Sequence, residues 1–120
     1  SRGLGDVYKR QELTQVITNF VNNAVDAMND EGKLWLITKK SEHKCSISVK
    51  DSGSGMDKAT QKKIFDPFFT TKEPGKGTGL GLHVVRKIIE KHEAKLELKS
   101  KLGEGTTFTI IFPTVKKKSH

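Results

Sequence analysis

The stretch Gly75-Lys76-Gly77-Thr78-Gly79-Leu80-Gly81-Leu82 opens an apolar-periodic segment that runs to about Lys91. Glycine lacks a Cβ atom, so its backbone can approach a ligand closely. Free N–H groups at a helix start also favour an anion. The stretch therefore predicts a phosphate-binding loop, with a flexible loop that only caps a helix as the alternative. It is not a P-loop, because Gly77 follows Lys76, and it lacks the spacing of a dinucleotide fingerprint.

Upstream, a helix is predicted from residue 13, because apolar residues recur there at three- and four-residue intervals. These residues are Leu13, Val16, Ile17, Phe20, Val21, Ala24, Val25 and Met28. The opposite face carries Asn19, Asn22, Asn23 and Asp26, within an arc of roughly 100°. Because carboxamides are poor helix formers, this face predicts a binding site. The alternative is a polar face that is hydrogen-bonded to a neighbouring loop.

Two alternating segments, residues 34–40 and 44–51, are predicted to form an antiparallel hairpin. In the second segment Ile47 and Val49 share one face, and Asp51 continues their phase. A buried carboxylate is costly unless it is hydrogen-bonded, so Asp51 is a candidate functional residue. A second hairpin is predicted from residues 95–101 and 106–112, joined by a glycine turn.

Between the hairpins, Asp57 is predicted to cap a short helix that ends at Ile64. A long segment without regular pattern follows to Gly79, and loops of this length are often binding loops. The order is then helix, hairpin, short helix, loop, helix, hairpin. It predicts an α+β fold, a two-layer α/β sandwich whose mostly antiparallel mixed sheet is covered on one face by three helices.

The chain has 120 residues, a length that suits one compact domain. A net charge of +8 allows attraction to nucleic acid or anionic membranes, but the lysines are scattered. No membrane-length apolar run or signal peptide is visible, and a single cysteine excludes an internal disulfide. Residues 1–11 resemble a translated library adapter and are predicted to be a non-native arm or cloning scar. Residues 12–114 would form the domain and residues 115–120 a basic tail.

Five motifs together resemble the GHKL superfamily of ATP-binding domains. The closest resemblance is to the catalytic (HATPase_c) domain of sensor histidine kinases, in the nitrogen-regulation-like subgroup. The motifs are Asn19-Phe20-Val21-Asn22-Asn23-Ala24 (N box), Asp51-Ser52-Gly53-Ser54-Gly55-Met56 (first glycine box), Phe65-Asp66-Pro67-Phe68-Phe69-Thr70-Thr71-Lys72 (F box), Gly77-Thr78-Gly79-Leu80-Gly81-Leu82 (second glycine box) and Gly103-Glu104-Gly105-Thr106-Thr107-Phe108 (closing turn). Each is weakly specific alone, but five in the right order are highly specific.

The resemblance implies that the domain binds ATP with Mg²⁺. Asn23 would ligate Mg²⁺ through its carboxamide oxygen, and Asn19 would help directly or through water. Asp51 would accept the hydrogen bond of the adenine amino group, because a carboxylate only accepts. The other implied ATP-binding residues are Asp26, Gly53, Gly55, Met56, Phe65, Lys72, Lys76, Gly77, Thr78, Gly79, Leu80, Gly81, Leu82 and Thr106. No catalytic side chain is implied with certainty.

Two departures from the family pattern are informative. Asn19 stands where ATP-hydrolysing members carry a glutamate general base, and Glu93-Ala94 stands where the family usually shows two glycines. The first departure favours phosphoryl transfer to a histidine over ATP hydrolysis. The resemblance places that histidine on a separate phosphoacceptor dimerisation domain of the same parent protein. This chain alone is therefore expected to bind ATP without autophosphorylation.

The resemblance also implies a response regulator as a partner and a cytoplasmic location, with membrane attachment only through other parts of the parent. Nucleic acid is not an expected partner. Two alternatives stay open. One is a serine kinase of the anti-sigma-factor type, which shares the fold. The other, favoured only by net charge, is a basic nucleic-acid-binding module.

Overall fold

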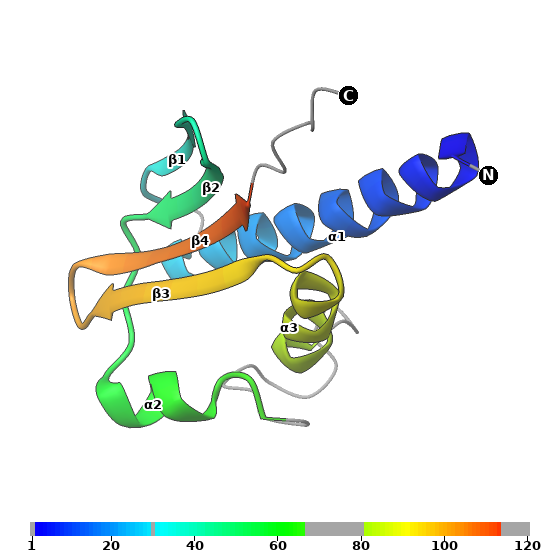
Figure 1. Ribbon diagram of the computed structural model, residues 1–120. Helices are drawn as coiled ribbons and strands as arrows, with labels where there is room; N and C mark the ends of the chain where they lie inside the picture. Colours follow the sequence, from blue (N-terminus) through cyan, green and yellow to red (C-terminus); the bar gives the residue numbers. More distant parts are fainter. Residues whose placement is uncertain (1, 30, 67–80, 114–120) are drawn as a thin grey trace.

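The computed structural model describes residues 2–29, 31–66 and 81–113 (Figure 1). In chain order the elements are α1 (Arg2–Met28), β1 (Leu34–Lys40), β2 (Lys44–Asp51), α2 (Lys58–Lys63), α3 (Leu82–Lys91), β3 (Lys95–Lys101) and β4 (Gly105–Pro113). The strands form one sheet in the order β1-β2-β4-β3. The predicted α+β fold is confirmed. All three pairings among these four described strands are antiparallel, so this part of the predicted mixed sheet contains no parallel pair.

The register of the sheet gathers the apolar residues of β2 and β4 beneath the helices. Val49 lies opposite Phe108, and the Phe20 ring of α1 stacks on Phe108 with 4.6 Å between centroids and 6° between planes. The buried core consists of Val16, Phe20, Val49, Ile64, Val85, Ile89, Ala94, Phe108 and Ile110. It draws on α1 and α3, which lie on the same side of the sheet (Figure 1).

Helix α1 is longer than the apolar periodicity predicts. It begins at Arg2 instead of residue 13, and its first turns extend beyond the sheet (Figure 1). A helix segment that covers no core needs no apolar stripe, so periodicity does not reveal it. The short predicted helix, α2, has its expected bounds and reaches the core through Ile64 at its C-cap.

The end of α3 is tied to α1. Glu12 Oε1 lies 3.0 Å from His92 Nε2, and Glu12 Oε2 accepts a hydrogen bond from Lys91 Nζ at 3.2 Å. The hydrogen bond from Lys91, with a further one to His92, holds the pKa of Glu12 below its ordinary value. Glu93 then turns the chain with φ 58°, a conformation that favours glycine. This is the position where the resembled family carries glycine.

Strand β1 lies at one edge of the four-stranded sheet, and all seven of its residues are exposed. Leu36 is 60% exposed, although its partner Val49 on β2 is only 2% exposed. On the opposite face, Lys50 Nζ lies 5.2 Å from the centroid of the Trp35 ring. Strand β1 therefore adds backbone pairing to the sheet but little to the core.

Candidate functional site

Asp51 is a buried carboxylate at the end of β2, with only 5% of its surface exposed. Its Oδ1 accepts hydrogen bonds from Gly53 N at 2.8 Å and from Thr106 N at 3.3 Å. Thr106 is also its partner in the β2–β4 register. Within the described residues no donor lies on Oδ2, and no fully buried side-chain oxygen lacks a partner. One oxygen is therefore held by the backbone, while the other keeps its capacity to accept a hydrogen bond.

The glycine turn after β2 lies against two neighbouring segments. Gly55 has φ 71°, and a Cβ atom there would lie 2.0 Å from Lys101 O, so a larger residue does not fit. Ser54 N donates to Ala27 O of α1 at 3.4 Å, and Ser54 O accepts from Gly103 N at 2.7 Å. The first glycine box therefore contacts both the C-terminal end of α1 and the β3–β4 turn.

The carboxamide face of α1 leads to this turn. Asn19 is 4% exposed, and its Oδ1 accepts a hydrogen bond from Asn23 Nδ2 at 3.0 Å. Asn23 is half-buried and Asp26 is exposed. Ala27, which contacts the glycine turn, lies one helical turn after Asn23. The fold thus brings the N box beside the first glycine box, as the predicted site requires.

Most of the predicted phosphate loop lies outside the described residues. This applies to Lys72, Lys76, Gly77, Thr78, Gly79 and Leu80. At its border, Gly81 is the N-cap of α3 and Leu82 begins the helix, as predicted. The Arg86 guanidinium lies 5.6 Å from the centroid of the half-buried Phe65 ring. The residues on either side of the loop are therefore in contact with each other.

Two polar side chains of this site, Gln61 and Ser100, were missed from sequence. Ser100 Oγ accepts a hydrogen bond from Met56 N at 2.8 Å and lies 2.7 Å from Thr106 Oγ1. Gln61 Nε2 donates to Met56 O at 2.9 Å. Ser100 carried a usable signal, because it continues the apolar phase of β3 just as Asp51 continues that of β2. Gln61 carried none, because its contacts are made only in the folded chain.

The site offers oxygen ligands to a divalent cation. Over residues 2–29, 31–66 and 81–113, no three His, Cys, Asp or Glu residues lie together in a way that could hold a metal ion. The nearby carboxamides of Asn19 and Asn23 have hard oxygens. Mg²⁺ usually keeps several waters and binds through few side chains plus substrate phosphates. The residues present therefore fit Mg²⁺ that arrives with a phosphorylated ligand.

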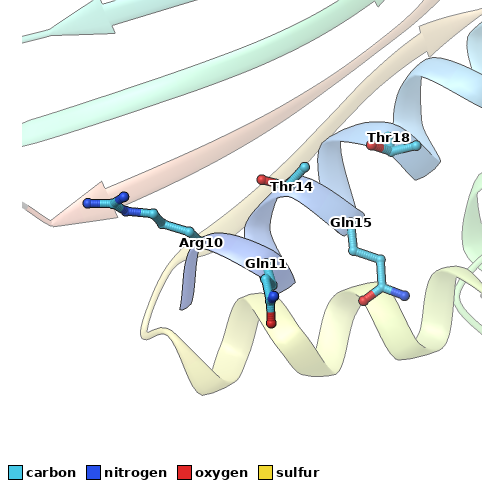
Figure 2. A pocket seen from close by; sticks show the side chains of 5 residues that line it. All are labelled: Arg10, Gln11, Thr14, Gln15 and Thr18. Carbon is cyan, nitrogen blue, oxygen red and sulfur yellow. The ribbon is translucent and has the colours of Figure 1, made fainter. Parts of the chain in front are cut away.

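A separate hollow of about 420 Å³ lies along the middle of α1 (Figure 2). Its lining residues are Arg10, Gln11, Thr14, Gln15 and Thr18. All five come from one helix, and none belongs to the predicted motifs. The hollow is therefore distinct from the site around Asp51.

Sequence comparisons place this arrangement in a known class. Residues 8–116 match the family model described as "Histidine kinase-, DNA gyrase B-, and HSP90-like ATPase". The signal transduction histidine-protein kinase AtoS of Escherichia coli K12 is 46% identical over 105 residues, which are 87% of this chain and 17% of AtoS. Sporulation kinase A of Bacillus subtilis is 42% identical over 104 residues, again 87% of this chain and 17% of that protein.

Solved structures agree. The nucleotide-free catalytic domain of histidine kinase ThkA superposes with a TM-score of 0.75 at 38% identity, covering 87% of this chain and 67% of that one. ThkA in complex with the response regulator protein TrrA gives a TM-score of 0.72 at 34% identity, covering 91% and 30%. The fold and the site define a GHKL-type ATP-binding domain. The chain belongs to the family of histidine kinase-, DNA gyrase B- and HSP90-like ATPases, and it spans 17% of the length of AtoS.

Proposed function

We propose that the chain is the ATP-binding catalytic domain of a two-component sensor histidine kinase. The observation that carries this proposal is the buried Asp51 carboxylate beside a close-packed glycine turn: one oxygen is held by backbone N–H groups, and the other has no donor among the described residues. A carboxylate only accepts hydrogen bonds, so it matches the amino group of adenine and not the carbonyl group of guanine. The similarity to proteins named as histidine kinases supports the same function.

The residue at position 19 supports phosphoryl transfer over ATP hydrolysis. Asn19 is buried, and its carboxamide cannot take a proton from an attacking water. The serine kinases of the anti-sigma-factor type usually keep a glutamate at this position. The γ-phosphoryl group would therefore pass to a histidine on the phosphoacceptor domain of the parent protein.

Asn23, helped by Asn19, is the proposed side-chain ligand of a Mg²⁺ ion that enters with ATP. The ion would neutralise charge on the phosphates. In the chain itself, the hydrogen bond between the two carboxamides fixes how they are oriented relative to each other. The loop residues Lys72 and Lys76 are further proposed phosphate contacts.

The partners and the location are proposed at the level of the parent protein. They are a phosphoacceptor dimerisation domain, a response regulator and the cytoplasm. One structural relative, ThkA, is seen in complex with the response regulator protein TrrA. None of the helices in the described ranges is long and apolar enough to cross a membrane. We propose residues 12–114 as the nucleotide-binding unit, with residues 1–11 as a non-native arm and residues 115–120 as a basic tail.

Titration calorimetry with ATP, in the presence and absence of Mg²⁺, tests nucleotide binding. We expect Mg²⁺ to strengthen binding and Asn23→Ala to remove most of that strengthening. Gln15→Ala, a change at an exposed carboxamide of α1 outside the N box, is the control. A folded sample that gives no heat with ATP and Mg²⁺ would contradict the proposal.

A transfer assay tests the kinase function. The chain is mixed with the histidine-bearing helical hairpin of its own parent protein and with γ-labelled ATP. We expect acid-labile label on the hairpin and none on the chain alone. Acid-stable label on a serine would instead support the anti-sigma-type kinase.

A further inference from the structure

We propose that Gln61 and Ser100 are positioning residues for nucleobase recognition. They hold the turn from Asp51 to Met56 in the orientation that aims Asp51 Oδ2 at the 6-amino group of adenine. This inference rests on the proposed function of the site, and it assigns a role to two side chains that lie outside the predicted motifs.

The hydroxyl of Ser100 joins three segments. Its Oγ accepts the hydrogen bond of Met56 N at 2.8 Å, donates to Gly105 O at 3.1 Å and lies 2.7 Å from Thr106 Oγ1. A hydroxyl has one hydrogen and two lone pairs. The contacts therefore balance when the Thr106 hydroxyl donates to Ser100. Every hydrogen-bonding position of Ser100 Oγ is then used within the protein.

The side-chain amide of Gln61 completes the attachment from α2. Its Nε2 donates to Met56 O at 2.9 Å and to Ser100 O at 3.1 Å. An amide NH₂ group has two hydrogens, and both are used here. A carboxylate has no hydrogen to donate, and an aliphatic side chain offers no hydrogen bond. Glutamine is therefore suited to joining these two carbonyl groups.

Together the two side chains fix both backbone polar groups of Met56. Ser100 holds its N–H group, and Gln61 holds its carbonyl group. The other end of the same turn is Gly53, whose N–H group orients Asp51 Oδ1. A change in the path of the turn therefore rotates the carboxylate. Precise recognition requires this kind of support behind the residue that makes the contact.

The test compares two nucleotides that differ at one group. ATP carries the 6-amino group, whereas purine ribonucleoside triphosphate lacks it. The wild-type chain should prefer ATP by roughly 10–100-fold, the value of a hydrogen bond to a charged group. Gln61→Leu and Ser100→Ala should each reduce that preference several-fold. If the two side chains only stabilised the fold, each substitution would weaken the binding of both nucleotides equally. The ratio of the two affinities would then stay unchanged.

Three further variants sharpen the test. Gln15→Leu makes the same substitution on the exposed surface of α1 and should leave the ratio unchanged. Ser100→Thr retains the hydroxyl and should restore much of the preference. In an Asp51→Asn background, Gln61→Leu should change the ratio of affinities little, because the carboxylate that Gln61 positions is already lost.

The outcomes separate this inference from the proposed function. If the folded wild type prefers ATP and both Gln61→Leu and Ser100→Ala keep that preference, the positioning role is wrong and the proposed function stands. If the folded wild type binds neither nucleotide, the proposed function fails and the inference falls with it. Circular dichroism of each variant identifies any that has lost its fold, and Ser100→Thr then supplies the comparison.

Discussion

The two oxygens of Asp51 are in different situations. Oδ1 receives two backbone N–H groups, which offset the cost of burying a charged carboxylate. Oδ2 has no donor among the described residues and retains its capacity to accept a hydrogen bond. Because the N–H groups come from Gly53 on one side and Thr106 on the other, the plane of the carboxylate is fixed before any ligand arrives.

The first prediction concerns the charge of this side chain. Asp51→Asn keeps the shape but replaces a charged acceptor with an amide, so we expect ATP affinity to fall roughly 10–100-fold, or about 1.5–3 kcal/mol. Titration calorimetry measures the loss. Asp57→Asn is the control, because Asn caps a helix as well as Asp does. If the wild type and Asp51→Asn bind ATP with equal affinity, Asp51 does not contact the adenine base.

The second prediction separates backbone conformation from close approach. Gly55 and Gly103 both have positive φ, at 71° and 80°, but a Cβ atom meets Lys101 O only at Gly55. Gly103→Ala should cost about 1–2 kcal/mol, and Gly55→Ala should cost about 1–3 kcal/mol more, because backbone must move. Chemical denaturation measures both values. Equal losses would show that the contact with Lys101 is unimportant.

At the scale of elements, α2 is a short helix that depends on its ends. Asp57 is its N-cap, and Oδ1 accepts the hydrogen bond of Thr60 N at 2.7 Å. Ile64 at the C-cap anchors the helix in the core. Between them, Gln61 connects the helix to the glycine turn. Residues 57–64 thus connect the core with the glycine turn.

The third prediction is an acid dependence of stability. The hydrogen bond from Thr60 N holds the pKa of Asp57 below its ordinary value. This carboxylate therefore stabilises the fold above about pH 4, and its contribution is lost as the pH falls through the lowered pKa. Asp57→Asn keeps the cap but does not titrate, so its unfolding free energy should fall less between pH 5 and pH 3. Parallel losses in the two proteins would contradict this assignment. Glu12, whose pKa is also lowered, is present in both the wild type and Asp57→Asn, so its contribution to the pH dependence cancels in the comparison.

Sequence patterns predicted the elements that follow simple periodicities. The alternation of β2 and the spacing of α3 gave the observed bounds, because each buries one face against the core. The start of α1 was wrong by several turns, because its first turns extend beyond the sheet (Figure 1), where a helix needs no apolar stripe. Asp51 was found because a carboxylate interrupts an apolar phase. Gln61 could not be found, because its role depends on bringing the carbonyl group of Ser100, 39 residues away, beside that of Met56.

At the scale of the molecule, the site lies where separate parts of the chain meet. The glycine turn contacts the end of α1 through Ala27, the β3–β4 turn through Gly103, and α2 through Gln61. A ligand that binds here favours the folded state over the unfolded chain, in which these segments are apart. Nucleotide binding and folding are therefore thermodynamically linked.

The fourth prediction follows from this linkage. ATP at about 100 times its dissociation constant, with Mg²⁺, should stabilise the chain by about 2.7 kcal/mol and raise its melting temperature by roughly 10 °C. Scanning calorimetry measures the shift. At the same ATP concentration the shift should be much smaller for Asp51→Asn, since that variant binds more weakly. A melting temperature that does not respond to ATP in the wild type would contradict binding at this site.

The exposed edge strand has a consequence for handling the isolated domain. Along β1 the free side of the backbone runs beside Trp35 and Leu36, a combination that invites pairing with the edge of a second molecule. Lys33 precedes this strand and Lys39 and Lys40 are its last two residues, and repulsion between these lysines and those of a second molecule opposes such aggregation. Crystallisation variants that replace surface lysines with alanine should therefore leave these three in place. Buffers of high ionic strength, which screen the repulsion, are the ones in which concentrated samples should first become turbid.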